Sequence, residues 1–291
     1  FGSFIFEMGN ICCNKTDASR GGKANNRLAR NERDRSASGR NMTLVVNMKN
    51  FKNLKYVTDI EDLYQIGKIL GKGSFGSVNR AKRVGADFEC AIKMINKDSL
   101  QSNPMLPRLM MSELTILKKC SHPNIMSVNE ILEDDENFYI VTEMLDGGEL
   151  FERLIEVQSF SEQKAAYILK QVLLAINYMH QKNITHRDLK PENILLESKE
   201  KDKLEIKISD FGFSCFFDPK EGLDLVLGSP LYMAPEIISG LKYNEKVDIW
   251  SIGVITYMLL SGRNPFPGRN KNEVKRMILN KEVDLNKPYF Q

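Results

Sequence analysis

One short stretch of the chain gathers three kinds of chemical group within eight residues. The sequence HRDLKPEN at residues 186–193 holds an aspartate that can accept a proton (Asp188), a cation (Lys190) and a metal-binding amide (Asn193). Phosphoryl transfer needs a group that meets the attacking hydroxyl, a charge that neutralises phosphate oxygens, and a ligand that holds a metal against them. The stretch therefore indicates phosphoryl transfer as the chemistry that the rest of the chain must position.

A glycine-rich segment could supply the phosphate-binding part. Residues 71–76 read GKGSFG, and glycines let a backbone approach a phosphate closely. The pattern alone is also typical of ordinary turns and of dinucleotide-binding loops. A dinucleotide loop needs a following helix, whereas residues 77–81 alternate as a strand does. We therefore expect strand, turn and strand over residues 64–78.

A lysine among apolar neighbours is the next candidate. Lys93 lies in CAIKMI at residues 90–95, a segment that we expect to be a strand. A buried ammonium without an anionic partner is costly. Residues 109–119 have apolar side chains at helical spacing and carry Glu113, which fits that need. The alternative, that both side chains are solvated, is disfavoured by the apolar residues beside Lys93.

Two long apolar segments must support the reactive stretch. Residues 162–180 predict an amphipathic helix, with His180 packing at its end. Its expected core stripe is Ala166, Leu169, Val172, Leu173, Ile176 and Met179. Asp248 opens the second segment, a buried helix that is too short to span a bilayer. We expect this aspartate to accept hydrogen bonds from the backbone of the reactive stretch.

Residues 64–291 resemble most of a eukaryotic serine/threonine protein kinase domain. The resemblance rests on HRDLKPEN, on the glycine-rich segment and on DFG at residues 210–212, where Asp210 follows Asp188 by 22 residues. It implies an α+β, bilobal fold, with a small antiparallel β-sheet lobe at residues 64–145 and a larger, mainly helical lobe at residues 146–291. The family has further helices in the larger lobe, so we expect the chain to be truncated at its C-terminus.

GGELF at residues 147–151 and FGFSCFF at residues 211–217 are similar to calcium/calmodulin-related and calcium-dependent protein kinases. This resemblance implies calcium regulation through sequence beyond residue 291. No calcium-binding loop of the D-x-[DN]-x-[DN]-G type occurs in the chain.

The resemblance also assigns roles to single residues. Asp188 would orient the substrate hydroxyl, Lys190 would neutralise the γ-phosphate, and Lys93 would pair with Glu113 and with the ATP phosphates. Asp210 and Asn193 would hold Mg²⁺. The residues expected to contact ATP are Leu70, Gly71, Lys72, Gly73, Ser74, Phe75, Gly76, Val78, Ala91, Lys93, Thr142, Glu143, Leu145 and Leu195. Of these, Thr142 is the expected gatekeeper, and the backbones of Glu143 and Leu145 would read the adenine edge.

Acidic residues are the expected substrate contacts. In the family, an acid at the position of Glu149 lies beside a substrate arginine three residues before the phosphoacceptor, and Glu192 could add a second contact. Glu149 is equally explained as an acid that favours the start of a helix. The protein substrates implied therefore present Ser or Thr with upstream Arg or Lys.

The segment between Cys215 and Gly228 contains no Ser, Thr or Tyr. Many kinases order this activation segment by pairing a phosphate with the arginine that corresponds to Arg187. We expect Asp218, Glu221 and Asp224 to supply negative charge instead, with a fixed carboxylate in place of the phosphate, and the enzyme to be active without phosphorylation there. Ser229 is expected to belong to the substrate platform.

Residues 1–60 read as a disordered basic tail. Residues 14–40 hold eight Lys or Arg against three acids, whereas the net charge of the whole chain, +3, is too small to indicate nucleic-acid binding. MGNICC at residues 8–13 resembles a myristoylation signal at Gly9 followed by palmitoylatable Cys12 and Cys13, although Cys13 stands where Ser or Thr is usual. The alternative is a tail with incidental cysteines. We expect a monomeric, cytoplasmic protein that associates with membranes through acylation.

The favoured function is transfer of the ATP γ-phosphate to Ser or Thr of proteins, with ATP and Mg²⁺ as cofactors. The alternative is a pseudokinase or scaffold that binds nucleotide or partners without catalysis. Pseudokinases usually lack at least one residue of the set Lys93, Glu113, Asp188, Asn193 and Asp210, and this chain has them all.

Overall fold

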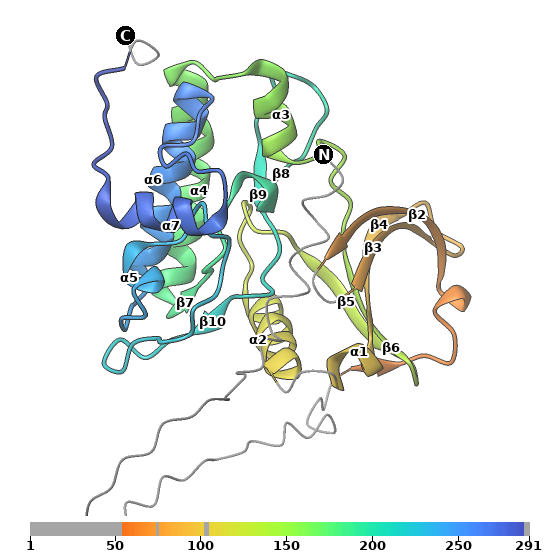
Figure 1. The fold of residues 1–291 in the computed structure, drawn as a ribbon. Helices are drawn as coiled ribbons and strands as arrows, with labels where there is room; N and C mark the ends of the chain where they lie inside the picture. Colours follow the sequence, from red (N-terminus) through yellow and green to blue (C-terminus); the bar gives the residue numbers. More distant parts are fainter. Residues whose placement is uncertain (1–53, 74–75, 102–104, 288–291) are drawn as a thin grey trace, which may run out of the picture. The chain divides into compact units, whose positions relative to one another are not determined.

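The computed structural model describes residues 54–73, 76–101 and 105–287 of the chain. Its small lobe is built on a six-stranded sheet in the order β1-β5-β6-β4-β3-β2 (Figure 1). The strands are β1 Lys55–Tyr56, β2 Tyr64–Gly73, β3 Gly76–Arg83, β4 Glu89–Asn96, β5 Val128–Glu133 and β6 Asn137–Glu143. All neighbouring pairs are antiparallel except β1 with β5, so the expected antiparallel sheet is mixed at one edge.

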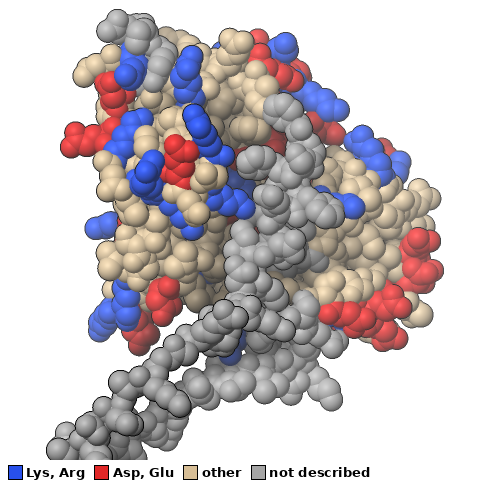
Figure 2. Space-filling model, in the orientation of Figure 1, with Lys and Arg blue, Asp and Glu red and all other residues tan. Residues whose placement is uncertain are grey.

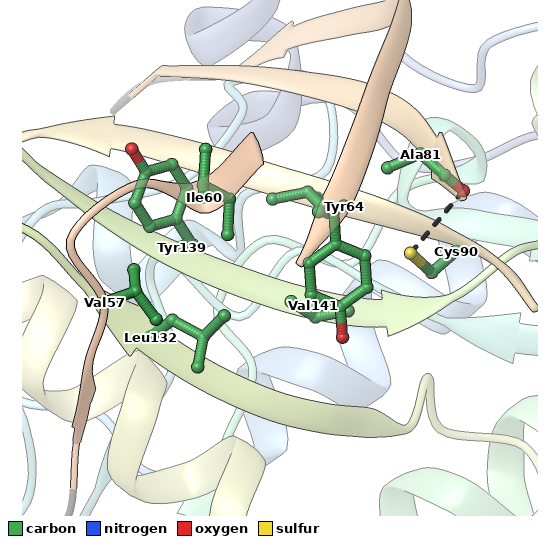
Figure 3. Close-up of a cluster of buried hydrophobic side chains, with 9 residues drawn as sticks. Val57, Ile60, Tyr64, Ala81, Cys90, Leu132, Tyr139 and Val141 are labelled. Atoms are coloured by element: carbon green, nitrogen blue, oxygen red, sulfur yellow. Dashed lines mark hydrogen bonds between the residues drawn. The ribbon is translucent and has the colours of Figure 1, made fainter. Parts of the chain in front are cut away.

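The apolar side chains on one face of this sheet form the core of the small lobe. Figure 3 shows Tyr64, Ala81 and Cys90, from β2, β3 and β4, gathered with residues of β5 and β6. Val57 and Ile60 belong to the same cluster and are only 7% and 5% exposed. The small lobe therefore includes residues that precede its expected start at residue 64, because these two apolar side chains are buried against the sheet.

Two helices follow β4, and the second of them, α2, carries Glu113. They are α1 Lys97–Gln101 and α2 Met105–Lys119. The large lobe is mainly helical, which confirms the expected α+β class. Its elements are α3 Leu150–Val157, α4 Glu162–Gln181, β7 Ile184–Thr185, the 3₁₀ turn η4 Pro191–Asn193, β8 Ile194–Leu196, β9 Ile206–Ile208, β10 Cys215–Phe216, α5 Pro235–Ile238, α6 Lys246–Ser261 and α7 Lys271–Asn280.

The buried face of α4 differs from the stripe expected from its sequence. Val172, Ile176 and Met179 are buried as expected, whereas Ala166 and Leu173 are exposed. The buried positions also include Ala165, Ile168, Gln171 and Ala175. Gln171 can be buried because its amide accepts a hydrogen bond from the backbone N–H of Ile206 at 3.1 Å and donates to the carbonyl of Leu204 at 2.8 Å.

Charged side chains are unevenly distributed over the face in Figure 2. Lys and Arg gather over the large lobe, whereas Asp and Glu gather along the outer edge of the small lobe, at the right of the view. Among the described residues, no helix is both long enough and apolar enough to cross a membrane.

Candidate active site

The backbone of the reactive stretch is fixed by one buried aspartate. The Asp248 carboxylate accepts hydrogen bonds from the backbone N–H groups of His186 and Arg187, both at 2.9 Å, which confirms the expected structural role. It also accepts from the Thr185 hydroxyl at 3.0 Å and pairs with His180 Nε2 at 2.8 Å. His180 is thus a hydrogen-bonding partner, not only a packing residue. Burial alone would raise the pKa of Asp248, but His180, His186 and the two N–H groups outweigh it and keep the pKa below its ordinary value.

Asp188, the third residue of the reactive stretch, has its carboxylate held by several neighbouring groups. Its Oδ1 accepts from the backbone N–H of Ser229 at 2.7 Å, and its Oδ2 lies 3.1 Å from Lys190 Nζ. The Asn193 amide donates to the Asp188 carbonyl at 2.8 Å and contacts Oδ2 at 3.3 Å. Lys190 also donates to the Ser229 hydroxyl at 3.1 Å. A proton acceptor, a cation and a hydroxyl-bearing loop therefore meet at one place.

A second group of charges joins the two lobes. Lys93 Nζ on β4 lies 2.6 Å from Glu113 Oε1 on α2 and 3.9 Å from Asp210 Oδ1 in the large lobe. Desolvation would lower the pKa of Lys93, but Glu113 and Asp210 outweigh it, so the pKa is raised and the ammonium stays charged. Burial raises the pKa of Glu113 and Lys93 opposes that shift. The short contact with a charged ammonium favours the ionised pair.

Asp210 remains ionised in this environment. Desolvation would raise its pKa, but Lys93, His186 and Lys190 together hold the pKa below the ordinary value. Its backbone has φ +55°, in the left-handed region that non-glycine residues seldom adopt, and its Oδ1 accepts from the N–H of Gly212 at 3.3 Å. Such conformations cluster at functional sites, where the surrounding structure maintains them.

The donors available to a metal are few and all oxygen. Asp210 offers a carboxylate, and Asn193 offers an amide oxygen, since its amide nitrogen is used by Asp188. No group of three or more His, Cys, Asp or Glu that could hold a metal occurs in the described part of the chain. Mg²⁺ is usually held by one or two carboxylates plus substrate phosphates and waters, so this sparse set fits Mg²⁺ bound together with a nucleotide.

The sheet places the expected nucleotide contacts in neighbouring positions. Val78 on β3 is paired with Lys93, and Ala91 on β4 is paired with Thr142 on β6. The Thr142 hydroxyl donates to the Ala91 carbonyl at 3.3 Å. Leu70, Gly71, Lys72 and Gly73 lie on β2. Ser74 and Phe75 lie outside the described residues.

Gly76 on β3 lies directly against the backbone of β4. A Cβ added at Gly76 would overlap the carbonyl oxygen of Met94, so this position admits no larger residue without movement of the sheet. At Gly71, by contrast, an added Cβ would have no atom within 4 Å. Packing against β4 therefore requires glycine at position 76, whereas Gly71 has open space beside the strand.

The segment that follows β6 is hydrogen-bonded to β8. Gly147 N donates to the Leu196 carbonyl at 3.1 Å, and Leu196 N donates to the Gly148 carbonyl at 2.9 Å. Glu149 pairs with Leu195 in an isolated bridge. The Glu143 side chain bonds to the backbone N–H of Ser127 at 2.7 Å and to Lys207 at 3.2 Å. Its backbone N–H donates to the Ser127 carbonyl at 3.3 Å, so both the carboxylate and the N–H of Glu143 are engaged on the protein.

Two acids stand close together in the large lobe. Burial, with repulsion from Glu152 and Glu192, raises the pKa of Glu149 to about 7. Burial also raises the pKa of Glu192, although the Tyr232 hydroxyl and the Lys190 ammonium oppose that shift. One oxygen of Glu192, Oε2, is buried without a hydrogen-bond partner. The Glu149 side chain caps no backbone N–H of α3, so helix capping does not explain the position of its carboxylate.

The activation segment is held differently from the expectation. Among the described residues, no carboxylate forms an ion pair with Arg187, and Asp224 is exposed. Arg187 instead donates through Nε to the Phe213 carbonyl at 2.6 Å and through a terminal nitrogen to the Tyr243 hydroxyl at 3.4 Å. An exposed carboxylate would lose its hydration on moving to the buried guanidinium, which opposes the expected pair.

Sequence reasoning missed Tyr232, Tyr243 and the bonding role of His180. None of them belongs to a recognised local motif, and each acts on a residue far away in sequence. Gly9, Cys12 and Cys13 lie outside the described residues, so the acylation expectation stays a prediction.

Fold and site together define a class of protein. A family model described as "Protein kinase domain" matches residues 64–289, and the chain therefore belongs to the protein kinase family, in its serine/threonine branch. The chain is 44% identical to Calcium-dependent protein kinase 4 of Plasmodium berghei (strain Anka) over 224 residues. This aligned region is 77% of this chain and 42% of that protein. The chain is 39% identical to Myosin light chain kinase A of Dictyostelium discoideum over 234 residues. This aligned region is 80% of this chain and 78% of that protein. The chain thus spans less than half the length of the calcium-dependent relative.

Proposed function

We propose that this chain transfers the γ-phosphate of ATP to serine or threonine hydroxyls of protein substrates. The observation that carries the proposal is the meeting of Lys93 and Asp210, 3.9 Å apart, although they belong to different lobes. Lys190 adds a second cation 3.1 Å from Asp188. This arrangement can grip a triphosphate on one side and present a proton acceptor to a hydroxyl on the other.

Each residue then has a defined task. Asp188 orients the substrate hydroxyl and accepts its proton as the oxygen bonds to the γ-phosphorus and the bond to the leaving ADP oxygen breaks. Lys93, fixed by Glu113, positions the phosphates, and Lys190 neutralises the transferred group. Asp210 and Asn193 would hold Mg²⁺, which when bound neutralises charge on the phosphate oxygens. The pseudokinase alternative gains no support, because no member of the reactive set is missing or displaced.

Substrate choice follows from the acidic pair. The buried, unpartnered oxygen of Glu192 beside Glu149 supports binding of a guanidinium, which has donors for both carboxylates. The proposal therefore includes a preference for arginine upstream of the phosphoacceptor. The test compares two serine peptides that differ only by Arg or Ala three residues before the serine. We expect a KM at least tenfold lower for the Arg peptide, and Glu149→Gln should remove most of that difference. Equal KM values would contradict the preference but not the kinase activity.

Regulation and location form a separate part of the proposal. Similarity to calcium-dependent protein kinases supports calcium control through sequence outside these 291 residues. The test compares activity with Ca²⁺ and with chelator for the product of the complete reading frame. MGNICC supports acylation of Gly9, Cys12 and Cys13 and membrane association of a cytoplasmic enzyme, because one acyl chain alone binds a membrane only weakly. Metabolic labelling with myristate and palmitate analogues checks this, with Gly9→Ala as the control.

A further inference from the structure

Arg187 presents a problem of buried charge. It is only 6% exposed, yet no carboxylate in the described part of the chain forms an ion pair with it. A buried cation must have its donors satisfied. Its Nε–H is satisfied by the Phe213 carbonyl, just after Asp210. A terminal nitrogen contacts the Tyr243 hydroxyl at 3.4 Å. A neutral phenol therefore stands where an anion would be expected.

The same phenol is bonded to the activation segment. The Tyr243 hydroxyl donates to the Leu225 carbonyl at 2.6 Å. The backbones of Tyr243 and Leu223 exchange two hydrogen bonds, at 2.8 and 2.9 Å, and the Lys242 ammonium donates to the Glu221 carbonyl at 3.1 Å. Residues 221–225 are thereby tied to the segment before α6 by four bonds, and only one of these comes from the phenol.

The tyrosine ring is itself immobilised. Tyr243 is 5% exposed and packs in a cluster with Met233, Ala234, Ile237 and Val247. Burial raises the pKa of its hydroxyl, while Arg187 opposes that shift, so the hydroxyl keeps its proton at neutral pH and remains a donor. Because ring and backbone are both fixed, the hydroxyl is held ready to bridge Arg187 and Leu225.

The bridged segment leads straight to the reactive groups. Three residues after Leu225, Gly228 has φ +113°, and a Cβ there would lie 2.5 Å from the Arg187 carbonyl oxygen. The next residue, Ser229, donates its N–H to Asp188 at 2.7 Å. The position of residues 223–229 therefore influences both the proton acceptor and the surface on which a substrate hydroxyl would lie.

We propose that Tyr243 is a positioning residue that takes the place of an activation-segment phosphate. Its hydroxyl links Arg187 to the Leu225 carbonyl, which holds the segment in order without any modification. Residues 216–228 contain no Ser, Thr or Tyr, so this stretch offers no hydroxyl whose phosphate could pair with Arg187. This inference rests on the proposed kinase function and specifies how that same site is kept active.

The experiment compares unphosphorylated wild-type protein, verified by mass spectrometry, with Tyr243→Phe, which keeps the ring and removes only the hydroxyl. Loss of one bridging hydroxyl should lower kcat/KM for a serine peptide about tenfold. The KM for ATP should stay within about twofold, because Lys93 is positioned by Glu113 on α2 and the substitution leaves both residues unchanged. The matched control is Tyr139→Phe, which removes another buried hydroxyl, bonded to Asp134 at 2.5 Å in the small lobe. This control should keep wild-type kinetics.

Hydrogen–deuterium exchange separates positioning from unfolding. In Tyr243→Phe we expect faster exchange in residues 220–228, with α4 and α6 unchanged. Wild-type kinetics in Tyr243→Phe would overturn the inference, as would faster exchange throughout the large lobe. A wild-type protein that works only after phosphorylation would also overturn it. A wild-type protein that transfers no phosphate under any condition would instead refute the proposed function.

Discussion

Lys93 and Asp210 come from different lobes, yet their Nζ and Oδ1 atoms lie 3.9 Å apart. Lys93 also contacts Glu113 at 2.6 Å, so three charged side chains from a strand, a helix and a loop meet at one point. Such an arrangement is costly for folding unless the charges compensate one another. Its presence therefore indicates a functional requirement.

Removal of Lys93 should reduce both stability and activity. Lys93→Met leaves Glu113 buried beside Asp210 without its cation, and breaking a buried pair by deletion of one partner costs about 3 kcal/mol in the free energy of unfolding. Urea unfolding measures this loss, and phosphate transfer to a serine peptide should fall at least a hundredfold. The control is Lys82→Met, which breaks an exposed ion pair with Asp87 and should change the unfolding midpoint little. Equal effects of the two substitutions would contradict the assignment.

Gly71 on β2 and Gly76 on β3 should respond differently to substitution. Gly76→Ala forces a Cβ against the Met94 carbonyl and should lower the free energy of unfolding by about 2 kcal/mol, as overpacking commonly does. Gly71→Ala meets no protein atom and should leave the stability of the nucleotide-free protein unchanged. It should nevertheless raise the KM for ATP several-fold, because it fills the space through which the backbone would approach phosphate. An unchanged KM for ATP would place the nucleotide elsewhere.

Asp248 should matter through the geometry of the reactive stretch. Asp248→Asn replaces one acceptor oxygen with a donor that faces the N–H group of either His186 or Arg187, and should cost about 3 kcal/mol in the free energy of unfolding. The pKa of Asp248 is lower in the folded protein than its ordinary 3.8. Its stabilising contribution is therefore complete above that value and is lost as the pH falls through the folded pKa. Acid unfolding should begin at a higher pH in the variant if the fold survives, and an unshifted acid transition would count against this role.

The binding of basic substrates should depend on pH near neutrality. The pKa of Glu149 is raised from 4.5 to about 7, so the carboxyl is protonated below that pH and cannot attract a guanidinium fully. The KM for the Arg peptide should fall as the pH rises through about 7, while the KM for the Ala peptide should not. Glu149→Gln should flatten the Arg profile. Persistence of the same profile in this variant would assign the titration to another group.

The same shift has a consequence for stability. A carboxyl whose pKa is raised on folding binds its proton more tightly in the folded state, so it destabilises the fold progressively as the pH rises from about 4.5 to 7. Between these values, Glu149→Gln should therefore become more stable relative to wild type as the pH increases. Urea midpoints at several pH values measure this trend.

Much of the fold could be predicted because its motifs lie in local stretches of sequence. HRDLKPEN, the DFG tripeptide and Lys93 in its apolar strand each carry their own pattern, and the lobes follow from the order of these motifs. The helix with Glu113 was also predictable, since its apolar residues repeat with the helical period. For these elements, local sequence and tertiary structure agree.

The remaining features depend on contacts that no local pattern contains. Val57 and Ile60 looked like part of a tail, but they pack against β5 and β6, which come some seventy residues later. Leu173 fitted a helical stripe, yet it is 46% exposed, while polar Gln171 is buried because Leu204 and Ile206 satisfy its amide. Tyr243 was invisible as a partner of Arg187 because a tyrosine has no charge to suggest the pairing.

The central claim is that Asp188 and Asp210 act together in transferring phosphate. The most direct measurement is the rate of ³²P transfer from γ-labelled ATP to a serine peptide with an upstream arginine, for wild type, Asp188→Asn and Asp210→Ala. We expect transfer by wild type and a fall of at least about a hundredfold in both variants, the loss typical for a proton acceptor or a charge-stabilising group. Wild-type turnover in either variant would contradict the account.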